Sequence, residues 1–301
     1  MTDAHDPADQ ERPEETHARP GAAFTVVGAL WKKAALEAWI PLVASVAILL
    51  AFCWIYVWII WLFEQEHGAL SGILRLLPSF VEDLVGLPLA DLASPAGKLA
   101  MLYVDAVTVF TCVGWSIGRG SDVVSGEIGR GTMELLLAQP VRRTTVLFIH
   151  AVVTTLGAAV LAVSTLAGLG LGMMTVPLEG SVSLWRYVPS AINLFYMMFF
   201  LAGVTTLASS WDSERWRTIG LACGFFVISL IVKMVARLWE DGSWLIYLTF
   251  LGAFEPHHLA LKTDQAWALS LRYDGALLAG GLACYVAAAL IFSRRDLPAP
   301  L

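Results

Sequence analysis

Residues 127–143 read EIGRGTMELLLAQPVRR and separate two long apolar runs, near 99–118 and 148–174. The segment carries acidic and basic side chains, and a charge placed in the hydrocarbon layer of a membrane is costly. Its apolar residues are nevertheless grouped between a glycine pair and a proline. A patterned polar connection between two runs of membrane length predicts a polytopic membrane protein that exposes this segment at one membrane surface.

The composition of the whole chain agrees with this prediction. Hydrophobic residues make up 57%, charged residues only 15%, and the mean hydropathy is +0.69, well beyond a soluble domain. A spanning helix needs about 20 predominantly apolar residues. We therefore expect an all-α fold with six transmembrane helices, near 40–63, 99–118, 148–174, 188–209, 218–239 and 275–293.

A further apolar run, 244–254, is too short to span a bilayer. We expect it to be re-entrant or interfacial, or else to extend a neighbouring helix. Orientation follows from the basic residues, which favour cytoplasmic loops. Most of the 19 lysines and arginines fall inside when the N-terminus is cytoplasmic. This predicts a multi-pass protein of the inner (plasma) membrane, with both termini and residues 127–143 in the cytoplasm.

The remaining segments divide as follows. Residues 1–22 are rich in acids and prolines and poor in apolar residues, which predicts a disordered cytoplasmic tail. Residues 23–39 have apolar side chains at helical spacing and predict an interfacial amphipathic helix that ends before Pro41. The alternative is that this helix extends the first span inward. Residues 40–295 form the transmembrane domain, and 296–301 a cytoplasmic tail.

Local rules predict a short helix inside the 127–143 segment. Gly129 and Gly131 favour a break or turn. Thr132 is a suitable N-cap, and Glu134 suits the first turn of the following helix. Pro140 ends that helix, because a proline pushes the preceding residue out of the helical region. The methionine and leucines between them are apolar on more than one side, so one side is expected to contact another protein.

These residues resemble the segment that joins the second and third spans in type 2 ABC transporter permeases. The residues that carry the resemblance are Glu127, Gly131, Thr132, Glu134, Leu135, Leu136, Leu137, Pro140, Val141 and Arg143. In that family the segment forms a coupling helix that docks on a separate ATP-binding subunit. The resemblance implies an ATPase-coupling contact made by Glu127, Gly131, Thr132, Glu134, Leu135, Leu136, Leu137, Pro140 and Arg143.

The resemblance also implies the partners. The chain has no GxxxxGKS/T loop to cradle phosphates, so ATP and Mg are expected on the ATP-binding subunit, and no cofactor or catalytic residue on this chain. Six spans are half of the twelve that are usual in this family, which implies that the chain pairs with a second copy of itself or with a related permease. Membrane lipid is the only other partner expected, and no nucleic acid. The resemblance favours export.

Polar residues inside the predicted spans are candidates for a transport pathway. Asp105 and Asn193 are the candidates here, although Asn193 also suits a hydrogen bond between helices. Lys233 and Arg237 share one helix face and are expected to extend toward the membrane surface. Gly168 lies four residues before Gly172, a spacing that predicts close helix packing.

Glu255, His257 and His258 are residue types that bind zinc, but no second group of ligands accompanies them, so no metal site is expected. Two other function classes remain open. An ATP-independent carrier needs inverted repeats, and an integral-membrane enzyme needs catalytic groups at one depth. Neither is visible in the sequence, so a permease subunit is the preferred interpretation.

Overall fold

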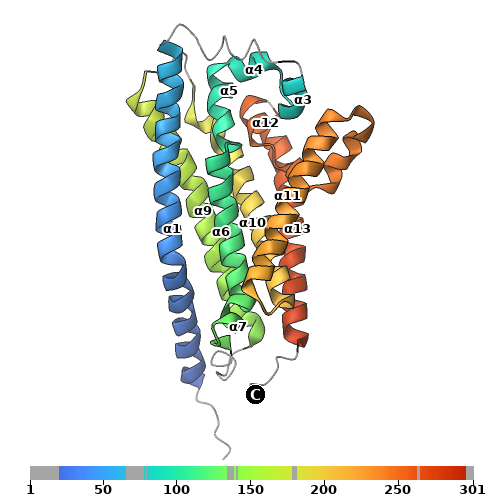
Figure 1. Ribbon diagram of the computed structural model, residues 1–301. Coiled ribbons are helices and arrows are strands. Elements are labelled where there is room, and N and C mark those ends of the chain that lie inside the picture. Colours follow the sequence, from blue (N-terminus) through green and yellow to red (C-terminus); the bar gives the residue numbers. More distant parts are fainter. Residues whose placement is uncertain are drawn as a thin grey trace, which may run out of the picture.

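The computed structural model describes residues 20–65, 78, 80–133, 139, 142–177, 182–262 and 265–295. Six segments are long and apolar enough to cross a membrane, and they run side by side along the molecule (Figure 1). They are Val26–Gln65, Pro95–Gly129, Arg143–Thr175, Leu184–Trp211, Arg215–Leu238 and Ala266–Arg294. The predicted all-α fold with six candidate transmembrane helices is therefore confirmed.

The short elements gather at the two ends of this bundle (Figure 1). The start of α1, helix α7 and the end of α13 (Ala266–Arg294) lie at one end, which we call the α7 end. Helices α3, α4, α5 and α12 lie at the other, the α12 end. Their bounds are α1 Pro20–Gln65, α3 Phe80–Val85, α4 Leu89–Ala93, α5 Pro95–Ala100, α7 Glu127–Gly129 and α12 Pro256–Leu261. In the predicted topology the α7 end faces the cytoplasm.

The first helix is longer than predicted. It runs without a break through Pro41, so the expected end of the helix before this proline is wrong. Upstream of the proline, Leu30 and Ala34 are buried against Val146 and Ile149 of α9 (Arg143–Thr175). This packing holds the segment in line with the rest of α1, and prolines are tolerated in membrane helices whose neighbours support the backbone. The alternative expectation, an inward extension of the first span, describes the structure.

The predicted terminal tails fall largely outside the described residues. Of 1–22, only the last residues belong to α1, and 296–301 are not described.

The second membrane segment is interrupted twice. Helix α5 passes through a 3-10 turn, η1 (Met101–Tyr103), before α6 (Ala106–Ser121) begins. Asp105 is the N-cap of α6, where its side chain accepts a hydrogen bond from the backbone N–H of Val107 at 2.9 Å. At its other end α6 passes into one π-helical turn, η2 (Asp122–Gly126), which leads into α7.

The fourth span begins with a 3-10 turn, η3 (Leu184–Tyr187), which leads into α10 (Val188–Trp211), and α11 (Arg215–Leu238) is the fifth span. Short elements at the α12 end then join α11 to the last span. The apolar run 244–254 forms most of two further 3-10 turns and extends neither neighbouring helix. These turns are η4 (Glu240–Leu248) and η5 (Phe250–Ala253), and they are followed by α12 and α13 (Ala266–Arg294).

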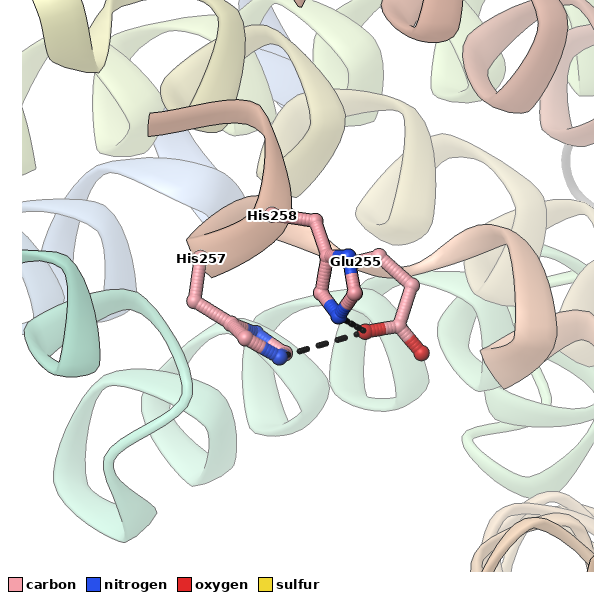
Figure 2. A group of neighbouring side chains, drawn as sticks. All are labelled: Glu255, His257 and His258. Atoms are coloured by element: carbon pink, nitrogen blue, oxygen red, sulfur yellow. Dashed lines mark ion pairs between the residues drawn. The ribbon is translucent and has the colours of Figure 1, made fainter. Parts of the chain in front are cut away.

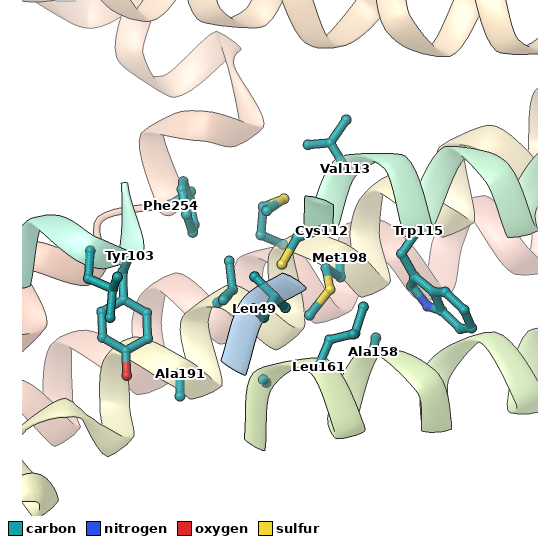
Figure 3. Packing of buried hydrophobic residues seen from close by; sticks show 14 of the residues in the cluster. Leu49, Tyr103, Cys112, Val113, Trp115, Ala158, Leu161, Ala191, Met198 and Phe254 are labelled. Atoms are coloured by element: carbon teal, nitrogen blue, oxygen red, sulfur yellow. The ribbon is translucent and has the colours of Figure 1, made fainter. Parts of the chain in front are cut away.

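A continuous core of buried side chains fills the space between the helices (Figure 3). Leu49 of α1, Cys112 of α6, Leu161 of α9 and Met198 of α10 are all fully buried there. Much of α11, by contrast, presents apolar side chains on the outside, as expected of a helix that faces lipid or another membrane protein. The core thus joins α1, α6, α9 and α10 into one unit.

Glycines allow α1 and α9 to approach closely. A Cβ atom added at Gly172 would lie 2.6 Å from the Cβ of Val57, and one at Gly168 would lie 2.7 Å from the Cβ of Cys53. Both distances are shorter than real Cβ contacts. The close packing predicted from the spacing of these two glycines is therefore confirmed.

Candidate functional site

The predicted coupling residues are only partly described. Glu127, Gly131, Thr132 and Arg143 lie in the described part of the chain. The residues predicted to form the exposed short helix lie outside it, so that helix stays a prediction; they are Glu134, Leu135, Leu136, Leu137 and Pro140. The structure therefore shows the two flanks of residues 127–143 and how each flank is attached to the bundle.

The first flank is a tight turn that only glycine suits. Helix α7 ends at Gly129, and Gly131 has a φ of 70°, in the left-handed region. The N–H of Gly131 donates to the carbonyl of Ile128 at 2.9 Å, and the N–H of Thr132 donates to the carbonyl of Glu127 at 3.1 Å. These two bonds form a Schellman motif, a common way to end a helix. The break expected from the glycine pair is confirmed, with Gly131 as the residue that makes it.

The side chain of Glu127 attaches the turn after α7 to helix α1. This side chain is fully buried and accepts hydrogen bonds from Lys33 Nζ at 2.6 Å, Arg130 Nη2 at 2.7 Å and Thr132 Oγ1 at 2.5 Å. Lys33 belongs to α1, whereas Arg130 and Thr132 belong to the turn itself. One buried carboxylate therefore joins the first helix to the start of the 127–143 segment, and each bond is strengthened by charge.

A second carboxylate, that of Asp122, forms ion pairs with three arginines. Arg130 Nη1 is 2.7 Å from Asp122 Oδ1, Arg119 Nη1 is 3.4 Å from Oδ2, and Arg215 Nη1 is 3.5 Å from Oδ1. Asp122 begins the π-helical turn η2, and such turns are frequent at functional sites. Because Arg215 begins α11, this cluster connects α6 and the turn to the fifth span.

The π-helical turn is also tied to α10 by a hydroxyl. The N–H groups of Val124 and Ser125 both donate to Ser209 Oγ, at 3.2 and 2.9 Å. Thr218 of α11 donates to Ser125 Oγ at 3.1 Å. A side chain of a neighbouring helix thus provides hydrogen-bond acceptors for buried backbone N–H groups of the π turn.

The second flank is attached through Arg143, the first residue of α9. Its Nη1 donates to the carbonyl of Arg295, which follows the end of α13. Arg295 in turn donates to the carbonyls of Ser210 and Asp212 at 3.0 and 3.1 Å. The start of α9, the α10–α11 connection and the end of α13 are therefore linked at the α7 end. No sequence pattern indicated this link.

The two candidate pathway residues, Asp105 and Asn193, both form hydrogen bonds within the bundle. Asp105 is the N-cap of α6, as described above. Asn193 is buried on α10, where its Nδ2 donates to Asp274 Oδ1 at 2.7 Å and its Oδ1 accepts from the N–H of Glu255 at 3.0 Å. A contact between α10, α13 and the start of α12 accounts for Asn193, and the pathway role of both residues stays a prediction.

A further charged cluster that the sequence did not predict lies around Glu255. Lys233 and Arg237 do not extend outward, because their side chains are only 12% and 13% exposed. Both pair with the same oxygen of Glu255, with Lys233 Nζ at 2.9 Å and Arg237 Nη2 at 2.5 Å. Arg237 Nη1 also donates to the carbonyls of Leu84 and Val85 of α3, both at 2.6 Å. The signal in the sequence was a pair of cations four residues apart within an apolar run.

Glu255 also faces two histidines (Figure 2). Its Oε2 lies 3.3 Å from His257 Nε2 and 3.9 Å from His258 Nε2. Burial raises the pKa of Glu255, but Lys233, His257 and Arg237 lower it more, so that it lies below its usual value. Burial lowers the pKa of His257 to about 4. Although these ligand atoms are close enough for a metal ion, the two cations on the same carboxylate oppose one, and we propose no metal here.

Comparison with known proteins gives one match, to a protein family. A search of curated proteins found no match. The model of the ABC-2 family transporter protein family matches residues 77–297, which include the five spans from α6 onward and the whole 127–143 segment. The chain therefore belongs to the ABC-2 transporter family and is a multi-pass transmembrane component of an ABC transporter.

Proposed function

We propose that this chain is the permease subunit of an ATP-driven exporter and that residues 127–143 are its contact with a separate ATP-binding subunit. The observation that supports this most strongly is the attachment of both flanks of the segment. Glu127 joins the first flank to α1 and the turn, and Arg143 joins the second to the end of α13. A segment held at both ends can pass a movement to the bundle.

The charged pairs suggest how such a movement would spread. A displacement of the turn would pull on Lys33 of α1 through Glu127, and on Arg215 of α11 through Arg130 and Asp122. These helices lie on opposite sides of α6 in Figure 1. Closure of the ATP-binding subunits would thereby shift the spans relative to each other, as in other transporters that alternate between two states.

In this proposal the chain performs no catalysis. ATP and Mg bind to the partner, and a second copy of the chain or a related permease completes the transport unit. Export is the proposed direction because the resemblance of the 127–143 segment favours it.

The test is co-purification. The tagged full-length chain is expressed in its own host, solubilised in mild detergent and affinity-purified, and an ATP-binding subunit is expected to co-purify in a near-equal amount. Glu134→Lys reverses a charge in the proposed contact and should abolish association while membrane insertion is retained. Glu240→Lys is the matched control, because Glu240 is exposed at the α12 end.

Two outcomes would count against the proposal. Normal association of the Glu134→Lys variant would mean that the contact lies elsewhere on the chain. A wild-type protein that repeatedly purifies alone would favour an ATP-independent carrier.

A further inference from the structure

A groove near the α12 end has the features of a lipid site. It is a cavity of about 370 Å³ bordered by α3, α6, α11 and η5. Most of its lining is apolar; examples are Val104, Val109, Phe226, Leu230, Met234 and Phe254. Phe110 of α6 also borders it and is 63% exposed, as Leu230 and Met234 of α11 are 41% and 42% exposed. The groove therefore lies among the apolar side chains that the bundle turns outward.

One end of the same groove is cationic. Lys233, Arg237 and His257 border it together with the apolar residues. Lys233 and Arg237 share a single oxygen of Glu255, which is the only carboxylate paired with either cation among the described residues. Two cations and one carboxylate leave one positive charge in excess. An excess charge that is almost buried is costly unless a further anion approaches it.

Two more observations favour a lipid headgroup at this end. Lys233 lies five residues before the end of α11, which is about 8 Å along the helix axis, so it is near the depth of the lipid headgroups. His257 is 3% exposed, and its Nδ1 has no hydrogen-bond partner, whereas its Nε2 contacts the carbonyl of Val85 at 3.0 Å. A headgroup hydroxyl can donate to this nitrogen.

We propose that this groove binds an anionic phospholipid with a hydroxylated headgroup, of the phosphatidylglycerol type. Its phosphate accepts a hydrogen bond from Lys233, and one acyl chain follows the apolar groove between α6 and α11. The lipid supplies the missing negative charge and covers apolar surface that α3 and η5 leave open. Helices α3 and α12, which border the site, lie at the opposite end of the bundle from α7 (Figure 1), and the proposal does not depend on the ATP-binding subunit.

The test measures thermal unfolding of the purified full-length chain in a neutral detergent. Phosphatidylglycerol and phosphatidylcholine with identical acyl chains are titrated in parallel, and glycerol phosphate serves as the headgroup without chains. For the wild type, phosphatidylglycerol is expected to raise Tm more than phosphatidylcholine, and glycerol phosphate is expected to have little effect.

Two variants test the two ends of the groove. Lys233→Met removes the charge and should weaken the apparent affinity for phosphatidylglycerol about tenfold or more. Ala106→Phe fills the apolar part while keeping every charge, and should remove the difference between the two lipids even if Lys233→Met proves unstable. Val286→Phe is the control, because Val286 is exposed on α13 and does not border this groove; it should respond like the wild type.

Three results would overturn the proposal. Equal shifts of the wild-type Tm by the two lipids would show that the charge does not select a lipid. An equal shift by glycerol phosphate would assign the site to a soluble anion. If Ala106→Phe instead lowered the fraction of dimer in size-exclusion chromatography and left the lipid response unchanged, the groove would be an interface between copies of the chain.

Discussion

The replacement Glu127→Gln tests whether the buried carboxylate attaches the coupling segment to the bundle. Glutamine keeps the size of the side chain and one acceptor oxygen but removes the negative charge that Lys33 and Arg130 share. A hydrogen bond to a charged group contributes about 1.5–3 kcal/mol. Because Lys33 and Arg130 are 33% and 39% exposed, water replaces part of the loss, and we expect a net destabilisation of about 2 kcal/mol.

The assay is thermal unfolding of the purified chain at fixed scan rate. Because the chain has 301 residues, about 2 kcal/mol corresponds to a fall in Tm of about 3–4 °C. The control is Glu214→Gln at the same end of the bundle, where a 47% exposed carboxylate pairs with Arg217 at 3.2 Å. An exposed pair of this kind contributes little, so Tm should change by about 1–2 °C at most. Equal Tm values for the two variants would refute the attachment role of Glu127.

Three further predictions follow from individual residues. Gly131→Ala should cost about 1–2 kcal/mol because φ is 70°, whereas Gly129→Ala, with open space at its Cβ position, should be neutral or slightly stabilising in the same unfolding assay. Gly172→Val should lower Tm by separating α9 from Val57 of α1, and Gly220→Ala, where the Cβ position is open, should not. Burial lowers the folded-state pKa of His257 to about 4, below the unfolded value of about 6.5. The unfolded chain therefore binds more protons between these values, so stability should fall as pH drops from 6.5 to 4, and a pH series on His257→Gln should show a shallower slope.

Much of the fold was predictable because the bilayer imposes a local rule. Apolar runs of sufficient length predicted the six candidate spans, and Gly131 with its neighbours predicted the turn after α7. The motif of 127–143 predicted the family, which the match over 77–297 shows. Its central residues lie outside the described part of the chain, so the exposed helix and its contact with an ATP-binding subunit stay predictions.

The errors arose where the outcome depends on neighbours in space. Pro41 was expected to end a helix, because a proline removes a backbone donor whatever surrounds it. In the structure, the packing of Leu30 and Ala34 on α9 keeps α1 continuous. Lys233 and Arg237 were expected to extend outward, but their side chains are mostly buried, because Glu255 lies close enough to pair with both.

The sequence by itself determined that this chain crosses the membrane, about where each span lies, and which segment connects the second span to the third. These features depend on hydrophobicity, helix length and glycine conformation, which are properties of neighbouring residues in the chain. Only the tertiary structure decided which charges meet: Lys33 with Glu127, Arg215 with Asp122, and the two cations of α11 with Glu255. Such pairs join residues far apart in sequence, and their formation depends on how the helices pack.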